Sequence, residues 1–212
     1  MKRYLDRHDA GRQLAAQLQP LAGRDDVVVF ALPRGGVPVG YEVAKALGAP
    51  LEAFMVRKLG VPGHEELAMG AIAAGHAPVL NHDLIERLKI SPAAVSAVVE
   101  REARELARRE AAYHAGQPPV APAGRVVILV DDGLATGSTM QAAVRALEQP
   151  SRVVVAVPVA AADTVARLRA EGLEIVCPWV PKAFYAVGLW YEDFEQTTDE
   201  EIRELLTTST PT

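Results

Sequence analysis

Three short runs of apolar residues, rich in valine and isoleucine, stand out along the chain. They cover residues 27–32, 125–130 and 152–159. Each run is continuous rather than alternating with polar residues, and this pattern is typical of a strand that is covered on both faces of a parallel sheet. Two shorter apolar segments, 51–56 and 173–177, predict two further strands.

A segment with helical spacing follows each of the three long runs after a few small residues. These segments cover residues 37–47, 139–147 and 163–171. Because strands that alternate with helices build βα units, the pattern predicts an α/β fold with a doubly wound, mostly parallel sheet flanked by helices. No internal repeat or low-complexity segment divides the chain, so we predict a single domain over residues 1–212.

Two segments and the C-terminal tail depart from this alternation. Residues 58–78 are rich in glycine and proline, and they predict a mobile loop followed by a short hairpin. Residues 91–114 predict a long helix with Ser91 as its N-cap and Pro92 at its first position. Its thin apolar stripe and many Glu and Arg residues favour a solvated amphipathic helix over a nucleic-acid-binding one. We expect the tail from residue 207 to be disordered.

The composition is that of an ordinary globular protein with an acidic balance. The 212 residues include 22 Lys and Arg against 27 Asp and Glu, which gives a formal net charge of −5. This balance argues against a dedicated nucleic-acid binder, which needs a basic face. The single cysteine, Cys177, cannot form an internal disulfide, and no apolar run reaches the roughly 18–20 residues of a membrane span. We therefore expect a cytoplasmic protein with no membrane partner.

The most informative stretch is VVILVDDGLATGSTM, residues 126–140. An apolar strand there delivers Asp131 and Asp132 at its carboxyl end, where open α/β sheets bind ligands. The loop that follows, 133–139, combines glycines, hydroxyl side chains and a helix start, whose unpaired N–H groups attract anions. This combination predicts a cradle for a phosphate monoester. It is not a P-loop, because the lysine of that motif is absent.

Two adjacent carboxylates repel a phosphate, so Asp131 and Asp132 need another partner. They fit a sugar diol or a hydrated Mg²⁺ beside the phosphate, and the alternative is that they only cap a turn. The stretch resembles the ribose-phosphate motif of the type I phosphoribosyltransferases, in which a short apolar strand, two acids and a loop ending Thr-Gly-x-Thr follow one another. The match runs from Asp131 to Thr139 without a gap.

The resemblance implies a role for each part of this motif. The acid pair would hold the ribose 2′- and 3′-hydroxyls of the donor, 5-phosphoribosyl 1-pyrophosphate. The loop would bind the 5-phosphate of the donor. The loop residues concerned are Ala135, Thr136, Gly137, Ser138 and Thr139.

A second candidate anion site follows the first strand. The turn there carries Pro33, Arg34, Gly35 and Gly36, which combine bare backbone amides with a guanidinium. A Rossmann nucleotide loop is the competing interpretation, but the glycine spacing fails its motif. By the family resemblance, this turn binds the pyrophosphate of the donor, and the peptide between Pro33 and Arg34 is the candidate for a cis bond.

Arg57 and Lys58 end an apolar segment and lead into a hinge-rich stretch. The arrangement predicts a lid that closes over a polyanion and excludes water, although an ordinary exposed loop has equal support from the residues alone. The resemblance places the flexible catalytic loop of the family here and implies catalytic roles for Arg57, Lys58 and His64. Glu65 or Glu66 is a further candidate for proton transfer.

Most of the few aromatic residues gather in residues 180–194. They form either a C-terminal core plug or an aromatic face that holds a flat heterocycle. Hypoxanthine-type members of the family carry a similar segment, and the resemblance implies base-binding roles for Phe184 and, second, for Trp190. It also places Glu192 or Asp193 near the metal and the pyrophosphate.

As a whole, the resemblance implies a type I phosphoribosyltransferase core with a small hood at about 178–206 and a helical insertion at about 81–116. The predicted function is Mg²⁺-dependent transfer of the phosphoribosyl group to a nitrogenous base, with release of pyrophosphate. The expected partners are the donor and a purine or pyrimidine base, in nucleotide metabolism and nucleoside salvage, and the expected assembly is a homodimer. The metal candidates are Asp131, Asp132 and Asp193.

Two departures from the family pattern bear on the substrate. Ala135 stands where purine-specific members carry an aspartate, and no lysine follows the run 152–159, where 6-oxopurine enzymes use one. A 6-oxopurine acceptor is therefore disfavoured. The same departures leave open a non-catalytic regulator that senses a nucleotide or the donor, whereas the glycine spacing disfavours a dinucleotide-dependent dehydrogenase.

Overall fold

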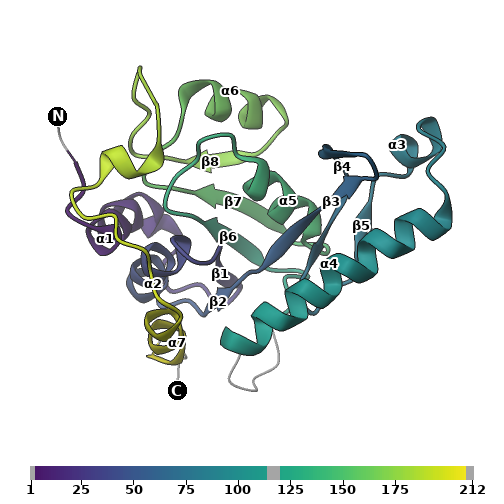
Figure 1. Ribbon diagram of the computed structural model, residues 1–212. Coiled ribbons are helices and arrows are strands. Elements are labelled where there is room, and N and C mark those ends of the chain that lie inside the picture. Colours follow the sequence, from purple (N-terminus) through teal and green to yellow (C-terminus); the bar gives the residue numbers. More distant parts are fainter. Residues whose placement is uncertain (1–2, 114–119, 209–212) are drawn as a thin grey trace.

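The computed structural model describes residues 3–113 and 120–208 of the chain. Its centre is a parallel sheet with the strand order β2-β1-β6-β7-β8 (Figure 1). The strands are β1 (Val27–Ala31), β2 (Leu51–Ala53), β6 (Val126–Val130), β7 (Arg152–Ala156) and β8 (Glu174–Val176). All five strands that the apolar segments predict are confirmed, and each lies within the segment that predicted it.

Helices cover both faces of this sheet (Figure 1). The helices of this part are α1 (Arg7–Leu18), η1 (Gln19–Leu21), α2 (Gly36–Leu47), α5 (Ser138–Ala146) and α6 (Ala162–Ala170). On one face, α1 and α2 pack against Val27 and Val29 of β1. On the other face, α5 and α6 share a core with Val28 and Phe30 of the same strand. Because successive residues of β1 enter different cores, the strand is apolar along its whole length.

A second, antiparallel sheet follows β2. It consists of β3 (Val56–Val61), β4 (His64–Ala73) and β5 (Val79–Leu80), in the order β3-β4-β5. The prediction of a loop over the first part of 58–78 is therefore wrong, because this part already forms the hairpin. The glycines that suggested a loop build the hairpin instead. Gly63 turns the chain with a φ of +77°, and a Cβ on Gly60 would lie 2.8 Å from the carbonyl oxygen of Glu65.

The long helix predicted from Ser91 onward is confirmed as α4 (Pro92–Tyr113), which α3 (His82–Arg87) precedes. The hydroxyl of Ser91 caps it by accepting the amide of Ala94 at 3.3 Å. Its thin apolar stripe, which includes Val98 and Leu106, packs on Leu59 of β3. Helix α4 therefore lies along the second sheet, to one side of the parallel sheet (Figure 1). Residues 114–116 of the expected insertion lie outside the described residues.

The C-terminal segment returns to the N-terminal end of the chain. It contains η2 (Val187–Trp190) and ends in α7 (Asp199–Thr208). The amide of Tyr4 donates to the carbonyl of Trp190 at 2.9 Å, and the amide of Glu192 donates to the carbonyl of Tyr4 at 2.8 Å. Residues 207 and 208 belong to α7, so the expected disorder is wrong for them, and residues 209–212 lie outside the described part. Within the described ranges, no helix has both the length and the hydropathy to cross a bilayer.

Candidate functional site

Strand β6 carries Asp131 and Asp132 to its carboxyl end, as the sequence predicts. Both residues are half-buried, and the amide of Asp132 donates a hydrogen bond of 2.8 Å to Oδ1 of Asp131. Burial raises the pKa of Asp131 well above its ordinary value of 3.8, and the charge of Asp132 raises it further. Burial also raises the pKa of Asp132. The fold therefore holds two carboxylates where negative charge is costly, and this favours ligands that neutralise or hydrogen-bond them.

Arg7, in the first turn of α1, faces this pair. Its Nε donates to Oδ2 of Asp132 at 2.9 Å, and its Nη1 donates to the carbonyl of Glu195 at 2.6 Å. The guanidinium also lies 3.9 Å from the centre of the Phe194 ring. Arg7 thus joins α1 and the C-terminal segment to the acid pair, and it counteracts the effect of burial on the pKa of Asp132. Sequence reasoning missed Arg7, because no local signal marks a contact between residues 125 positions apart.

The C-terminal segment also closes on the backbone of the same strand end. The hydroxyl of Tyr191 donates to the carbonyl of Asp132 at 2.6 Å. Burial raises the pKa of Tyr191 above its ordinary value, so the phenol stays protonated and remains a donor. A Cβ on Gly133 would lie 2.7 Å from the side chain of Val187, which shows how closely the two segments pack. The position of the acid pair therefore depends on both ends of the chain.

The loop 135–139 is anchored from one side by α6. The hydroxyl of Thr164 donates to the carbonyl of Ala135, and Nη2 of Arg167 donates to the carbonyl of Thr136, both at 2.6 Å. A trans peptide is planar, with its N–H pointing away from its C=O, so the amides of Thr136 and Gly137 point away from α6. Neither of these amides donates to any protein group within the described residues.

The start of α5 completes this loop. Gly137 precedes the helix with a φ of +73°, in the left-handed region that favours glycine. Ser138 and Thr139 occupy the first turn with exposed side chains. Outward-facing amides, hydroxyl groups and a helix N-terminus are together able to hold a phosphate, because each supplies a donor or a positive partial charge.

The turn after β1 presses directly against the acid pair. The peptide between Pro33 and Arg34 is cis, as the resemblance implies. A Cβ on Gly35 would lie 2.0 Å from Oδ2 of Asp132, and a Cβ on Gly36 would lie 2.7 Å from the carbonyl oxygen of Val130. Both positions therefore require glycine. The amide of Gly36 is used within the turn by the carbonyl of Leu32, at 3.0 Å, so of the expected bare amides only those of Arg34 and Gly35 remain open within the described chain.

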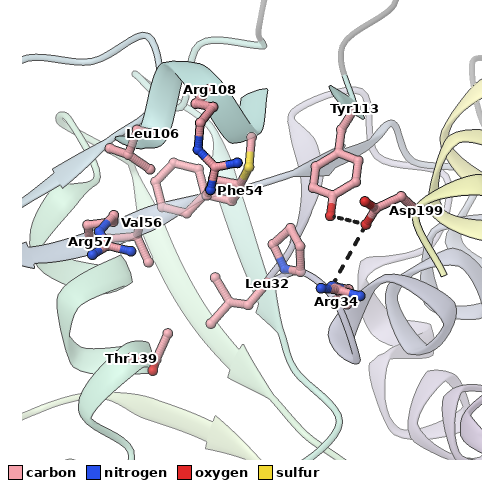
Figure 2. Close-up of a pocket in the computed structure, with 12 residues that line it drawn as sticks. Leu32, Arg34, Phe54, Val56, Arg57, Leu106, Arg108, Tyr113, Thr139 and Asp199 are labelled. Carbon is pink, nitrogen blue, oxygen red and sulfur yellow. Dashed lines mark hydrogen bonds and ion pairs between the residues drawn. The ribbon is translucent and has the colours of Figure 1, made fainter. Parts of the chain in front are cut away.

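A cavity of about 270 Å³ lies between this turn, the β3 strand and α4 (Figure 2). Three arginines line it from three different elements: Arg34 from the turn, Arg57 from β3 and Arg108 from α4. Two further residues line it: Thr139, from the loop 135–139 that we call the phosphate loop, and Asp199 of α7. The cavity thus connects three of the segments that the sequence analysis selected: the glycine turn, the segment of Arg57 and the loop 135–139. The acid pair is not part of its lining.

The predicted lid residues separate into two groups. Arg57 lines the cavity, and its Nε donates to Oε2 of Glu102 on α4. Lys58 follows it in the strand but does not line the cavity. His64 and Glu65 are exposed at the end of the hairpin and do not line the cavity. The side chain of residue 66 lies outside the described residues.

The two aromatic candidates for base binding occupy different environments. Trp190 is 4% exposed and packs edge-on against Trp179, with ring centres 4.8 Å apart. Phe184 is half-buried and lies roughly parallel to Trp190, with ring centres 6.4 Å apart. Because Trp190 is nearly covered by protein, its ring offers no open face for a base. Phe184 lies nearer to the surface and keeps part of its ring accessible.

Asp193 does not join the acid pair. Among the residues that the structure describes, no group of three or more His, Cys, Asp or Glu side chains is placed to hold a metal ion. Asp193 is exposed, and its Oδ1 accepts the amide of Glu195 at 3.0 Å. The expectation of one metal group made from Asp131, Asp132 and Asp193 is therefore corrected. The neighbouring carboxylates of Asp131 and Asp132 remain as candidate metal ligands.

Comparisons relate the chain to known proteins by its sequence and its fold. Residues 2–185 match the phosphoribosyl transferase domain family. A protein of Mycobacterium tuberculosis (strain ATCC 25618 / H37Rv), provisionally named a phosphoribosyl transferase, is 47% identical over 204 residues, which are 95% of this chain and 46% of that protein. The chain thus spans about half the length of this curated relative. The crystal structure of TT1426 from Thermus thermophilus is similar over 100% of both chains, with a TM-score of 0.89 and 42% identity.

The raised pKa of Asp131 gives a testable pH dependence of stability. Between the ordinary pKa of 3.8 and the raised value, the native state binds more protons than the unfolded state, so stability falls as pH rises through this window. Asp131→Asn removes the buried charge and keeps an oxygen for the Asp132 amide. We expect the variant to unfold at higher urea concentration than the wild type at about pH 7, with a difference that shrinks toward about pH 4. The exposed Asp25→Asn is the control, and a pH-independent difference would contradict the account.

The contact between Arg7 and Asp132 is testable by a double-mutant cycle. Arg7→Met leaves a buried carboxylate without its charged donor, and we expect it to lower the free energy of unfolding by about 1.5–3 kcal/mol. In the Asp132→Asn background, the same substitution should cost at least about 0.5 kcal/mol less, because the two side chains form one interaction. Urea denaturation of the four proteins measures the coupling, and strictly additive effects would show that the pair contributes no coupling energy.

Proposed function

The chain belongs to the phosphoribosyl transferase domain family, and from this premise we propose that it transfers the phosphoribosyl group of 5-phosphoribosyl 1-pyrophosphate to a nitrogenous base. Pyrophosphate is the leaving group. One observation carries the proposal: the glycine turn after β1 touches the acid pair after β6, and the phosphate loop follows that pair without a break. Together, these three segments suit a phosphorylated sugar that carries a second anionic group.

Each segment of the site suits one part of the donor. The outward amides of Thr136 and Gly137, with the start of α5, suit the 5-phosphate. The acid pair suits the ribose hydroxyls, because hydroxyl groups donate to carboxylates and relieve the cost of buried charge. The turn with Arg34 and the neighbouring Arg57 suit the pyrophosphate, which needs cationic donors.

The donor set of this site also fits Mg²⁺. This ion takes oxygen ligands and is usually bound through one or two carboxylates together with substrate phosphates. Asp131 and Asp132 offer such carboxylates, and a cation would relieve the charge that raises the pKa of Asp131. When bound there, Mg²⁺ would neutralise part of the negative charge of the pyrophosphate. Asp131 and Asp132 are the residues that would hold it.

The chain's own residues would contribute mainly electrostatic stabilisation. Positive charge develops on the sugar as the bond to pyrophosphate breaks, and the buried carboxylates of Asp131 and Asp132 favour that charge. Arg34 and Arg57 favour the negative charge of the leaving group. The hairpin β3–β4 carries Arg57, and closure of its exposed end over the donor would exclude water from the reacting carbon.

The acceptor would lie on the side of the C-terminal segment, against Phe184 rather than Trp190. Phe184 keeps part of its ring accessible, whereas Trp190 is nearly covered. A flat purine or pyrimidine base fits an aromatic face of this kind. Ala135 offers no carboxylate to exchange a proton with a purine, so the proposal leaves the base unnamed within that class.

The direct test is an assay of pyrophosphate release. The protein is incubated with 5-phosphoribosyl 1-pyrophosphate, Mg²⁺ and each of a panel of purine and pyrimidine bases. Release of pyrophosphate with one base and not without it supports the transferase. Tight binding of the donor with no release for any base would contradict the transferase and favour a sensing regulator.

Asp132→Asn tests the role of the acid pair in binding. Losing one charged acceptor costs about 1.5–3 kcal/mol, so we expect donor binding to weaken about 10- to 100-fold. Titration calorimetry with 5-phosphoribosyl 1-pyrophosphate and Mg²⁺ measures the change. Asp25→Asn, at an exposed aspartate outside the site, should bind like the wild type. Equal affinities for Asp132→Asn and the wild type would remove this aspartate from the binding site.

A further inference from the structure

Helix α4 supplies a third arginine to the cavity beside the glycine turn. Arg108 lines this cavity together with Arg34 and Arg57, and Figure 2 shows the three side chains reaching it from α4, the turn and β3. Helix α4 lies in the segment 81–116, outside the acid pair, the loop 135–139 and the glycine turn. Its contribution is therefore additional to the motifs on which the proposed function rests.

The cavity is suited to a small polyanion rather than to a base. Its volume of about 270 Å³ admits either ligand, so the charge of its lining is what favours an anion. Among the charged residues in its lining, three are arginines and one, Asp199, is acidic. An arginine presents five N–H donors in a fixed fork, which matches the oxygen atoms of phosphate groups.

None of the three guanidinium groups has all its donors occupied by the partners seen in the structure. Arg108 donates through Nε and Nη2 to Glu105, at 3.1 and 2.8 Å, which leaves its Nη1 group. Arg57 donates through Nε to Glu102, which leaves both of its Nη groups. Arg34 lies 3.8 Å from Asp199, measured from Nε to Oδ1, which is an ion pair longer than a hydrogen bond.

Helix α4 is held against β3, so the backbone position of Arg108 beside the cavity is defined, although its side chain is exposed. Glu102 of α4 is 7% exposed and accepts hydrogen bonds from both Arg57 and Arg101. One turn further along, Leu106 is buried against the hairpin. At the C-terminal end of α4, the hydroxyl of Tyr113 donates to Oδ1 of Asp199 at 2.7 Å, and so joins α4 to α7. Arg108 lies between these anchored positions.

We propose that Arg108 is a binding residue for the pyrophosphate end of the donor, on the opposite side of the cavity from Arg34. This inference rests on the proposed function. The pyrophosphate then contacts guanidinium groups from α4, β3 and the turn, and α4 acts as the outer wall of its site. The sugar and its 5-phosphate stay with the acid pair and the phosphate loop, which Arg108 does not touch.

The test compares Arg108→Gln with the matched control Arg104→Gln. Arg104 is an exposed arginine one turn earlier on α4, ion-paired to Glu100 at 3.9 Å, and it does not line the cavity. Titration calorimetry uses two probes in the presence of Mg²⁺: inorganic pyrophosphate and ribose 5-phosphate. We expect Arg108→Gln to weaken pyrophosphate binding at least tenfold and to leave ribose 5-phosphate within twofold of the wild type. Arg104→Gln should leave both probes within twofold.

The outcomes separate this inference from the proposed function. If the wild type binds pyrophosphate and Arg108→Gln binds it equally well, the role of Arg108 is wrong and the proposed function stands. Equal weakening of both probes by Arg108→Gln would also overturn it, because the effect would not be local to the pyrophosphate. A wild type that binds neither probe would overturn the proposed function and the role of Arg108 together. Partial recovery of pyrophosphate binding in Arg108→Lys would support a charged contact.

Discussion

The structure of this site depends on the cost of holding two neighbouring carboxylates at the half-buried end of a strand. Burial and the charge of Asp132 raise the pKa of Asp131, and burial also raises the pKa of Asp132, an effect that Arg7 counteracts. Nothing in the packing of the sheet requires this arrangement, since an apolar or amide side chain would avoid the penalty. Charged residues kept at such a cost are common where ligand binding, rather than the stability of the fold, explains which residues are present.

The surrounding segments are arranged around this pair by short-range constraints. Glycine at 35 and 36 lets the turn approach the acid pair at a distance where a Cβ would collide with Asp132 or with the backbone of Val130. Side chains of α6 bond two carbonyls of the phosphate loop, so the amides of the same peptides point away from α6. Arg7 and Tyr191 bring both ends of the chain to Asp132. Two loops and both terminal segments of the described chain thus meet at the carboxyl ends of β1 and β6, where open α/β sheets place their ligands.

The sequence predicted those features that depend on local pattern. The five parallel strands follow from continuous apolar runs, and the acid pair with its loop follows from one uninterrupted motif. The first part of the hairpin β3–β4 was predicted as a mobile loop, because its glycines fit both a flexible loop and a tight antiparallel pairing. The close approach of Gly60 to Glu65 distinguishes the two. Arg7 was missed because its partner is distant in sequence. Asp193 and Trp190 were assigned from the family resemblance, which cannot show that one faces solvent and the other is buried.

The central claim is that the acid pair and the loop after it hold a phosphorylated pentose. The most direct measurement is a crystal structure of the protein with ribose 5-phosphate and Mg²⁺. We expect the phosphate against the amides of Thr136 and Gly137, with the 2′- and 3′-hydroxyls on Asp131 and Asp132. Density for the sugar at another place, with the carboxylate of Asp132 still held by Arg7 alone, would overturn this proposal.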